Sequence, residues 1–327
     1  MLAERYGEAG KAKCLQDAQY HLSYLSEAIG AESPLLFTEY CAWAKHMLAA
    51  RNIPVDDLEQ NLLSMKHVLL AELKEEQGKI AADYIDTSLK LLNDIQSGTE
   101  SFLVNEDSPT GLLARDYLNY LLEGKRNLAS QMILKSVENG IPVKDIYENV
   151  FEKSQYEIGR LWQENKINVA QEHYCTAATQ LIMSQLYNYI ISDAPKNKTI
   201  VSACVEGDYH EVGLRMVTDF FEMDGWDTFH LGANTPTAAL INVIEEKQPD
   251  IVLLSATMTY HVAKLAEVIE KIRAKKHLDT TKIMVGGYPF KLAPKLWEKI
   301  GADGFAESAS KALEKAQEIM STKNHSA

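Results

Sequence analysis

One short loop contains two residues of types that can bind a metal. Asp208 and His210 stand two positions apart, and Gly213 follows three residues later. A histidine can coordinate a metal through one ring nitrogen, while a carboxylate that accepts the N–H of the other nitrogen fixes the tautomer and raises the basicity of the ligand. A glycine at this position allows a helix to begin close to a ligand. For a histidine that stands alone, a surface side chain beside a helix start is the simpler interpretation, so the surrounding elements must decide.

The elements around this loop alternate between short apolar strands and amphipathic helices. We predict strands at residues 200–205, 228–231, 251–255, 283–285 and 304–306. Helical stretches lie between them, for example at 212–223 and 263–274. Short apolar strands that alternate with helices indicate a parallel sheet covered on both faces. We therefore predict a flavodoxin-like, doubly wound domain with a five-stranded parallel sheet.

In such a sheet the ligand lies at the carboxyl ends of the strands. The candidate residues at this edge are Asp208 and His210 after the first predicted strand, Ser255 and Thr257 at the third, and Gly286 and Gly287 at the fourth. Because parallel strands end at the same edge, we expect these residues to converge on one crevice.

The chain before residue 199 consists of two helical blocks. Residues 1–96 have apolar side chains at roughly helical spacing, and an acidic first turn follows Pro54, which suits the start of a helix. Residues 111–192 predict four helices with short connections, typical of a small bundle. Within that block, Asn168 and Gln171 match a capping box.

Segments rich in turn-forming residues, at 97–110 and 193–198, separate these regions. The predicted fold class is multi-domain, α followed by α/β. Its parts are an N-terminal helical sensory or dimerisation bundle (1–100), a four-helix cap (108–194) and the flavodoxin-like domain (197–327).

Composition excludes several classes of protein. There are 33 Lys and Arg against 46 Asp and Glu, a net charge of −13, and such a field opposes binding to nucleic acid. No apolar stretch approaches the ~20 residues of a membrane span, and the first residues lack an apolar signal core. The four cysteines are scattered without a CxxC pair, which argues against a disulfide framework or a zinc ribbon. We expect a cytoplasmic protein that binds neither nucleic acid nor membranes.

The three motifs at the sheet edge together resemble the cobalamin-binding domain family, whose pattern is DxHxxG, then SxL or SxT, then GG. The resemblance covers residues 199–320. It implies that His210 is the lower axial ligand of cobalt, in place of the cofactor's own benzimidazole, and that Asp208 holds His210. It further implies that the slot for the nucleotide tail is lined by Ser255, Thr257, Gly286 and Gly287. Thr257 stands where many members have leucine.

The helical block at 108–194 resembles the cap that precedes this domain in many cobalamin proteins. This block contains Trp162, then nine residues, then Glu172 and His173. The pattern resembles the cap motif of cobalamin light sensors. By that resemblance these three residues cover the upper face, where the adenosyl group of adenosylcobalamin lies. A broad indole can pack on that group, and the Glu and His can hydrogen-bond its polar edges. In some light sensors a histidine follows the tryptophan, but here Gln163 does, a poor cobalt ligand. A core tryptophan beside a solvated helix start is the alternative.

The first 96 residues contain many aromatic and histidine side chains. The overall layout is similar to that of photocobilins, light sensors that pair cobalamin with biliverdin. Such a bundle can hold a second planar chromophore, and Cys14 or Cys41 can attach a bilin. A dimerisation bundle with core aromatics is the alternative.

Two functions follow from these resemblances. The first is a photoreceptor in which light cleaves the Co–C bond of adenosylcobalamin and changes the cap position and the assembly. Such a protein is expected to be a homo-oligomer, to signal to a protein partner that the sequence does not identify, and not to be an enzyme itself. The alternative is a corrinoid methyl-carrier protein that serves a methyltransferase. The loop after the first strand lacks the GxGxxG of a dinucleotide-binding domain.

Overall fold

The N-terminal region of the computed structural model is a bundle of four helices. The structure describes residues 2–92, 100–103, 108–192 and 194–321. The bundle helices are α1 (Leu2–Gly30), α2 (Pro34–Ala49), α3 (Val55–Glu72) and α4 (Glu75–Leu92). Pro34 occupies the first turn of α2. Pro54 immediately precedes α3, and two acidic residues lie in the first turn of that helix, as predicted. A proline suits these positions because the first helical N–H groups have no partner within the helix.

The second helical region is the cap. Its helices are α5 (Pro109–Leu122), α6 (Arg126–Glu138), α7 (Val143–Ile146), the π-helical segment η1 (Tyr147–Glu152), α8 (Lys153–Gln163), α9 (Val169–Gln185) and the short η2 (Tyr187–Tyr189). Because α7, η1 and α8 run on without a break, they form one long helix. The predicted capping box is confirmed: Asn168 and Gln171 each accept the other's backbone N–H through the side chain, at 2.9 and 3.0 Å.

The C-terminal region is an α/β domain. Its strands are β1 (Thr199–Cys204), β2 (Asp227–His230), β3 (Ile251–Ser255), β4 (Lys282–Gly286) and β5 (Gly304–Phe305), all parallel, in the order β2-β1-β3-β4-β5. The helical elements are α10 (Val212–Met223), α11 (Thr237–Lys247), η3 (Thr259–His261), α12 (Val262–Arg273), η4 (Lys276–Leu278), α13 (Tyr288–Leu292), α14 (Leu296–Lys299) and α15 (Ala309–Ser321). The predicted fold is confirmed, and each predicted strand end lies within one residue of the observed end.

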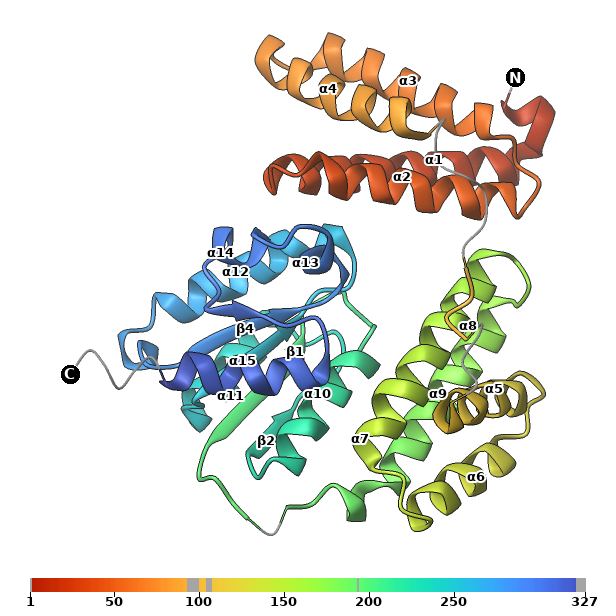
Figure 1. The fold of residues 1–327 in the computed structure, drawn as a ribbon. Coiled ribbons are helices and arrows are strands. Elements are labelled where there is room, and N and C mark those ends of the chain that lie inside the picture. The colour runs from red at the N-terminus through yellow and green to blue at the C-terminus, as the bar shows by residue number, and fades with distance from the viewer. Residues whose placement is uncertain (1, 93–99, 104–107, 193, 322–327) are drawn as a thin grey trace.

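Apolar packing joins the three regions. Helices α10 and α15 cover one face of the sheet, and α11 and α12 cover the other. Phe220 of α10 belongs to the core of the cap, whereas Tyr260, just after β3, packs on the core that continues into the N-terminal bundle. Figure 1 shows the bundle lying over both α8 of the cap and α12–α14 of the α/β domain. The bundle therefore contacts both of the regions that could enclose a ligand.

The predicted linkers fall largely at the joints of these regions. Residues 97–99, 104–107 and 193 lie outside the described residues. Pro109 and Thr110, which we assigned to the first linker, are instead the first residues of α5. Ser108 caps this helix, because its side chain accepts the backbone N–H of Gly111 at 3.1 Å. In the part of the chain that the structure describes, no helix is long and apolar enough to cross a membrane.

Candidate functional site

The structure brings Asp208 and His210 together directly after β1. Asp208 is fully buried, and its Oδ1 accepts both the backbone N–H of His210 (3.0 Å) and the ring Nδ1–H of His210 (2.9 Å). The other carboxylate oxygen, Oδ2, accepts the backbone N–H of Thr257 at 2.6 Å. A carboxylate held on both oxygens fixes the ring, so Nε2 of His210 is the nitrogen available to a metal.

The charges of this pair stabilise each other. Burial raises the pKa of Asp208, but the hydrogen bonds from His210 and Thr257 outweigh it and hold the pKa below its usual value. The bond to Asp208 raises the pKa of His210 against the effect of burial. Because Asp208 stays ionised, it keeps Nδ1 of His210 as the protonated nitrogen.

The ends of β3 and β4 form the rest of this edge. Ser255 ends β3, and Gly286 ends β4 beside it. Gly287 has φ +115°, and a Cβ on it would lie 2.0 Å from the carbonyl oxygen of Ala256. Only a glycine allows the backbone after β4 to approach the backbone after β3 this closely. A Cβ on Gly213, by contrast, would meet nothing within 4 Å, so the start of α10 is open to a ligand.

The cap contributes one acidic side chain to the same region. The charge of Glu172, in the first turn of α9, adds to the raised pKa of His210, so this turn of the cap lies within electrostatic range of His210. His173 is mostly exposed, with its Nε2 3.4 Å from Glu172 Oε2. Further along α9, Gln180 donates to Glu211 Oε1 at 2.7 Å. The second half of α9 is thus bonded to the residue that precedes α10, at the end of the loop after β1.

Trp162 lies at the end of α8 and faces the N-terminal bundle. Its ring stacks on Trp43 with centroids 6.1 Å apart, and the Arg51 guanidinium carbon lies 5.5 Å from its centroid. Glu172 and His173 lie in the first turns of the next helix, as expected. Trp162 packs partly on the core of the cap, and its ring also contacts Trp43 and Arg51 of the N-terminal region.

A second histidine near Asp208 was not identified from the sequence. His261 is 7% exposed, and its Nδ1 lies 3.8 Å from Asp208 Oδ2. Within the described residues this nitrogen has no hydrogen-bond partner. Tyr260 packs edge-on against His261 and against Tyr24 of α1. No local sequence signal identifies this contact, because it joins segments far apart in the chain.

These residues fit a corrinoid whose cobalt takes one protein ligand. His210 has one nitrogen fixed by a buried carboxylate, and its side chain is 59% exposed. The start of α10 is open beside Gly213, and Gly287 fits against Ala256 only because it has no side chain. The edge of the sheet is therefore accessible to a ligand.

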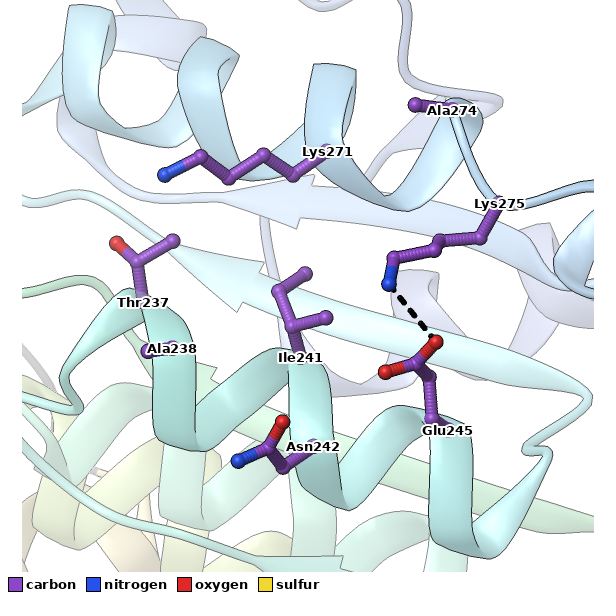
Figure 2. A pocket seen from close by; sticks show the side chains of 8 residues that line it. All are labelled: Thr237, Ala238, Ile241, Asn242, Glu245, Lys271, Ala274 and Lys275. Atoms are coloured by element: carbon purple, nitrogen blue, oxygen red, sulfur yellow. Dashed lines mark ion pairs between the residues drawn. The ribbon is translucent and has the colours of Figure 1, made fainter.

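A pocket of about 390 Å³ lies elsewhere, between α11 and α12. Figure 2 shows Lys275 and Glu245 paired across it, with 2.9 Å between Nζ and Oε1. Lys271, which also lines it, pairs with Glu267 at 2.6 Å. None of the candidate residues of the sheet edge lines this pocket, so it is separate from the site.

Comparison with known proteins identifies the family. Two models described as B12 binding domain match residues 198–314 and 113–187. A dimethylamine corrinoid protein of Methanosarcina acetivorans is 30% identical over 199 residues, which cover 58% of this chain and 90% of that protein. A corrinoid protein of Desulfitobacterium hafniense is 26% identical and covers 61% of this chain and 94% of its own length. The chain belongs to the family of cobalamin-binding corrinoid proteins with a helical cap.

A solved structure supports the fold. The monomethylamine corrinoid protein of Methanosarcina barkeri aligns with a TM-score of 0.56 at 24% identity, covering 64% of this chain and 99% of that one. A model described as Phycobilisome protein matches residues 3–92, which form the N-terminal bundle.

These findings correct the main functional prediction. We expected a light-sensing protein, but the relatives are corrinoid proteins, several of them named for dimethylamine. The photoreceptor prediction is therefore wrong, and the stated alternative fits the relatives better. The error has a physical reason: the spacing of Trp162, Glu172 and His173 resembles a cap motif, but a spacing does not determine which group a bound corrinoid carries.

A partly buried acid in the contact between the cap and the α/β domain predicts a pH effect. Tyr147 of η1 donates its hydroxyl to Asp219 Oδ2 at 2.8 Å, and burial raises the pKa of Asp219 to about 6. The folded state therefore holds this proton more tightly than the unfolded state, and stability falls as pH rises from about 4 to about 6. Asp219→Asn keeps the acceptor for Tyr147 and removes the partly buried charge. We expect it to raise the free energy of unfolding by about 1–2 kcal/mol at pH 8, with little change at pH 4.

Urea unfolding of the cobalamin-free protein at both pH values measures this difference. Tyr147→Phe is the opposite control, because it leaves the partly buried acid without its donor and is expected to destabilise the protein at pH 8. An equal effect of Asp219→Asn at both pH values would contradict the assignment.

Proposed function

We propose that this chain is a corrinoid protein that carries a methyl group for a methyltransferase system. The observation that carries the proposal is the 30% identity to a dimethylamine corrinoid protein over 90% of that protein's length. The buried Asp208 bonded to the exposed His210 supports it, because a corrinoid carrier needs one well-oriented nitrogen ligand.

The proposed roles follow the positions of the side chains. His210 would hold the cobalt through Nε2, and Asp208 orients its ring. Ser255, Thr257, Gly286 and Gly287, at the ends of β3 and β4, would line the slot for the nucleotide tail, and Gly213 would leave room for the corrin beside α10. Trp162, Glu172 and His173 cover the upper side from the cap. The proposed domains are 1–100, 108–194 and 197–327.

When bound, the cobalt supplies the atom that accepts and releases the methyl group. The chain's own residues orient and protect it. Asp208 keeps the Nδ1 proton of His210 in place and thereby directs Nε2 outward. Glu172 and the apolar cap helices limit the access of water to the upper side.

The upper ligand and a second cofactor are separate proposals. Adenosylcobalamin is the form that the cap motif predicts, whereas methylcobalamin is the form expected of a methyl carrier. Biliverdin in the N-terminal bundle stays a prediction. The match of residues 3–92 to the phycobilisome protein model favours it, and reconstitution of the full chain with biliverdin, followed by its absorption spectrum, tests it.

Methyl transfer from dimethylamine tests the proposed function. The full chain is loaded with cobalamin, reduced, and incubated with dimethylamine and the dimethylamine methyltransferase of Methanosarcina acetivorans. We expect methylamine to be released and the absorption spectrum to change to that of methylcobalamin. The corrinoid protein of the same organism is the positive control. If that control is methylated and the loaded chain is not, the proposal is wrong for this substrate class.

A further inference from the structure

The end of α2 is bonded to the end of α8. Arg51, two residues beyond α2, donates to the carbonyl oxygens of Gln163 at 3.0 Å and Trp162 at 3.2 Å. The same guanidinium also donates to Met47 O at 2.9 Å, which holds it against its own helix. The last carbonyl groups of a helix lack partners within it, so α8 offers acceptors at this point. A planar guanidinium with several donors can bond two of them at once.

The contact is reciprocal and includes the indole ring. Gln163 donates its side-chain amide to the carbonyl oxygen of Trp43 at 3.2 Å. The Trp43 ring stacks on Trp162, and Arg51 lies over the same Trp162 ring. Both the backbone and the side chain of Trp162 are therefore held by residues of the N-terminal bundle.

The bundle is also attached to the α/β domain. Tyr24 packs edge-on against Tyr260 with centroids 5.3 Å apart, and Glu27 accepts the backbone N–H of Ala263 at 3.1 Å. These contacts lie just after β3, next to the edge that carries Ser255 and Thr257. The position of Trp162 relative to the sheet edge is thus set by the bundle as well as by the cap.

We propose that Arg51 is a positioning residue that fixes Trp162 over the upper side of bound cobalamin, so that the N-terminal bundle determines which upper ligands of cobalt fit. The B12-binding models match only residues 113–187 and 198–314, so neither model includes this contact. The inference rests on the proposed placement of Trp162 in the cap.

The test compares the affinity of the full chain for methylcobalamin and for adenosylcobalamin. These ligands differ only above the cobalt, so the ratio of their dissociation constants reports the upper side alone. A general loss of folding, or a change at His210, alters both affinities by the same factor. We expect Arg51→Gln to change the ratio by about tenfold, the effect of losing one charged hydrogen-bonding group. Arg51→Lys, which lacks the planar fork, is expected to give a smaller change.

Two further variants separate the possible outcomes. Lys66→Gln removes an ion pair with Asp86 that joins α3 to α4 within the same bundle, and it is expected to leave the ratio unchanged. Trp162→Ala tests the placement itself. If Trp162→Ala changes the ratio and Arg51→Gln does not, the role of Arg51 is wrong. If neither changes it, the placement of Trp162 over the upper side is wrong, whatever the result of the methylation assay.

Discussion

His210→Ala is expected to abolish the protein-derived axial nitrogen on cobalt and to weaken cobalamin binding on the order of 100-fold. The structure gives this residue the features of a ligand: Nδ1 is bonded to a fully buried carboxylate, and the ring is more than half exposed. Removing a partner of a ligand already costs 10–100-fold in affinity, so removal of the ligand itself is expected to reach at least the upper end of that range.

The measurement is the electron paramagnetic resonance spectrum of the Co(II) form bound to protein labelled with ¹⁵N-histidine. If histidine is the axial ligand, labelling changes the splitting by the axial nitrogen, and His210→Ala removes that label-dependent splitting. His173→Ala is the matched control, because His173 is also exposed and lies in the first part of α9. If the splitting still depends on the label in His210→Ala but no longer does so in His173→Ala, the ligand is His173 of the cap instead.

The sequence predicted the local features of this site well. Asp208 and His210 belong to one loop after one strand, so their contact depends on a few neighbouring residues. The strands were found because their apolar runs are bounded by polar turns, and the helix beginning at Val169 because its cap residues are adjacent in sequence.

The features that the sequence missed all join distant segments. Arg51 and Trp162 are 111 positions apart. The contact of His261 with Asp208 joins η3 to the loop after β1. Nothing in the spacing of Tyr147 and Asp219 indicates that they would be bonded. The incorrect photoreceptor prediction has a different cause, since the resemblance of three cap residues to a motif does not determine which group a bound corrinoid carries.

Two glycine substitutions distinguish glycines needed for folding from those that leave room for the cofactor. Gly287→Ala is expected to lower the free energy of unfolding by about 3 kcal/mol or more and to abolish cobalamin binding. Its φ of +115° is strained for any L side chain, and the new Cβ would lie 2.0 Å from Ala256 O. Positive φ and overpacking each cost about 1–3 kcal/mol. Urea unfolding of the cobalamin-free protein measures the loss.

Gly213→Ala is the matched partner, and its expected effect on folding is opposite. Gly213 lies in the first turn of α10, where a Cβ meets no atom within 4 Å, so alanine is expected to leave stability unchanged or to raise it by up to about 1 kcal/mol. If the corrin approaches the loop after β1, the added methyl group occupies part of its space, and cobalamin affinity falls although the protein is no less stable. Cobalamin titration of both variants decides the matter. Unchanged affinity in Gly213→Ala would mean that the corrin does not reach the start of α10, and a stable Gly287→Ala protein would mean that the ends of β3 and β4 do not need their close approach.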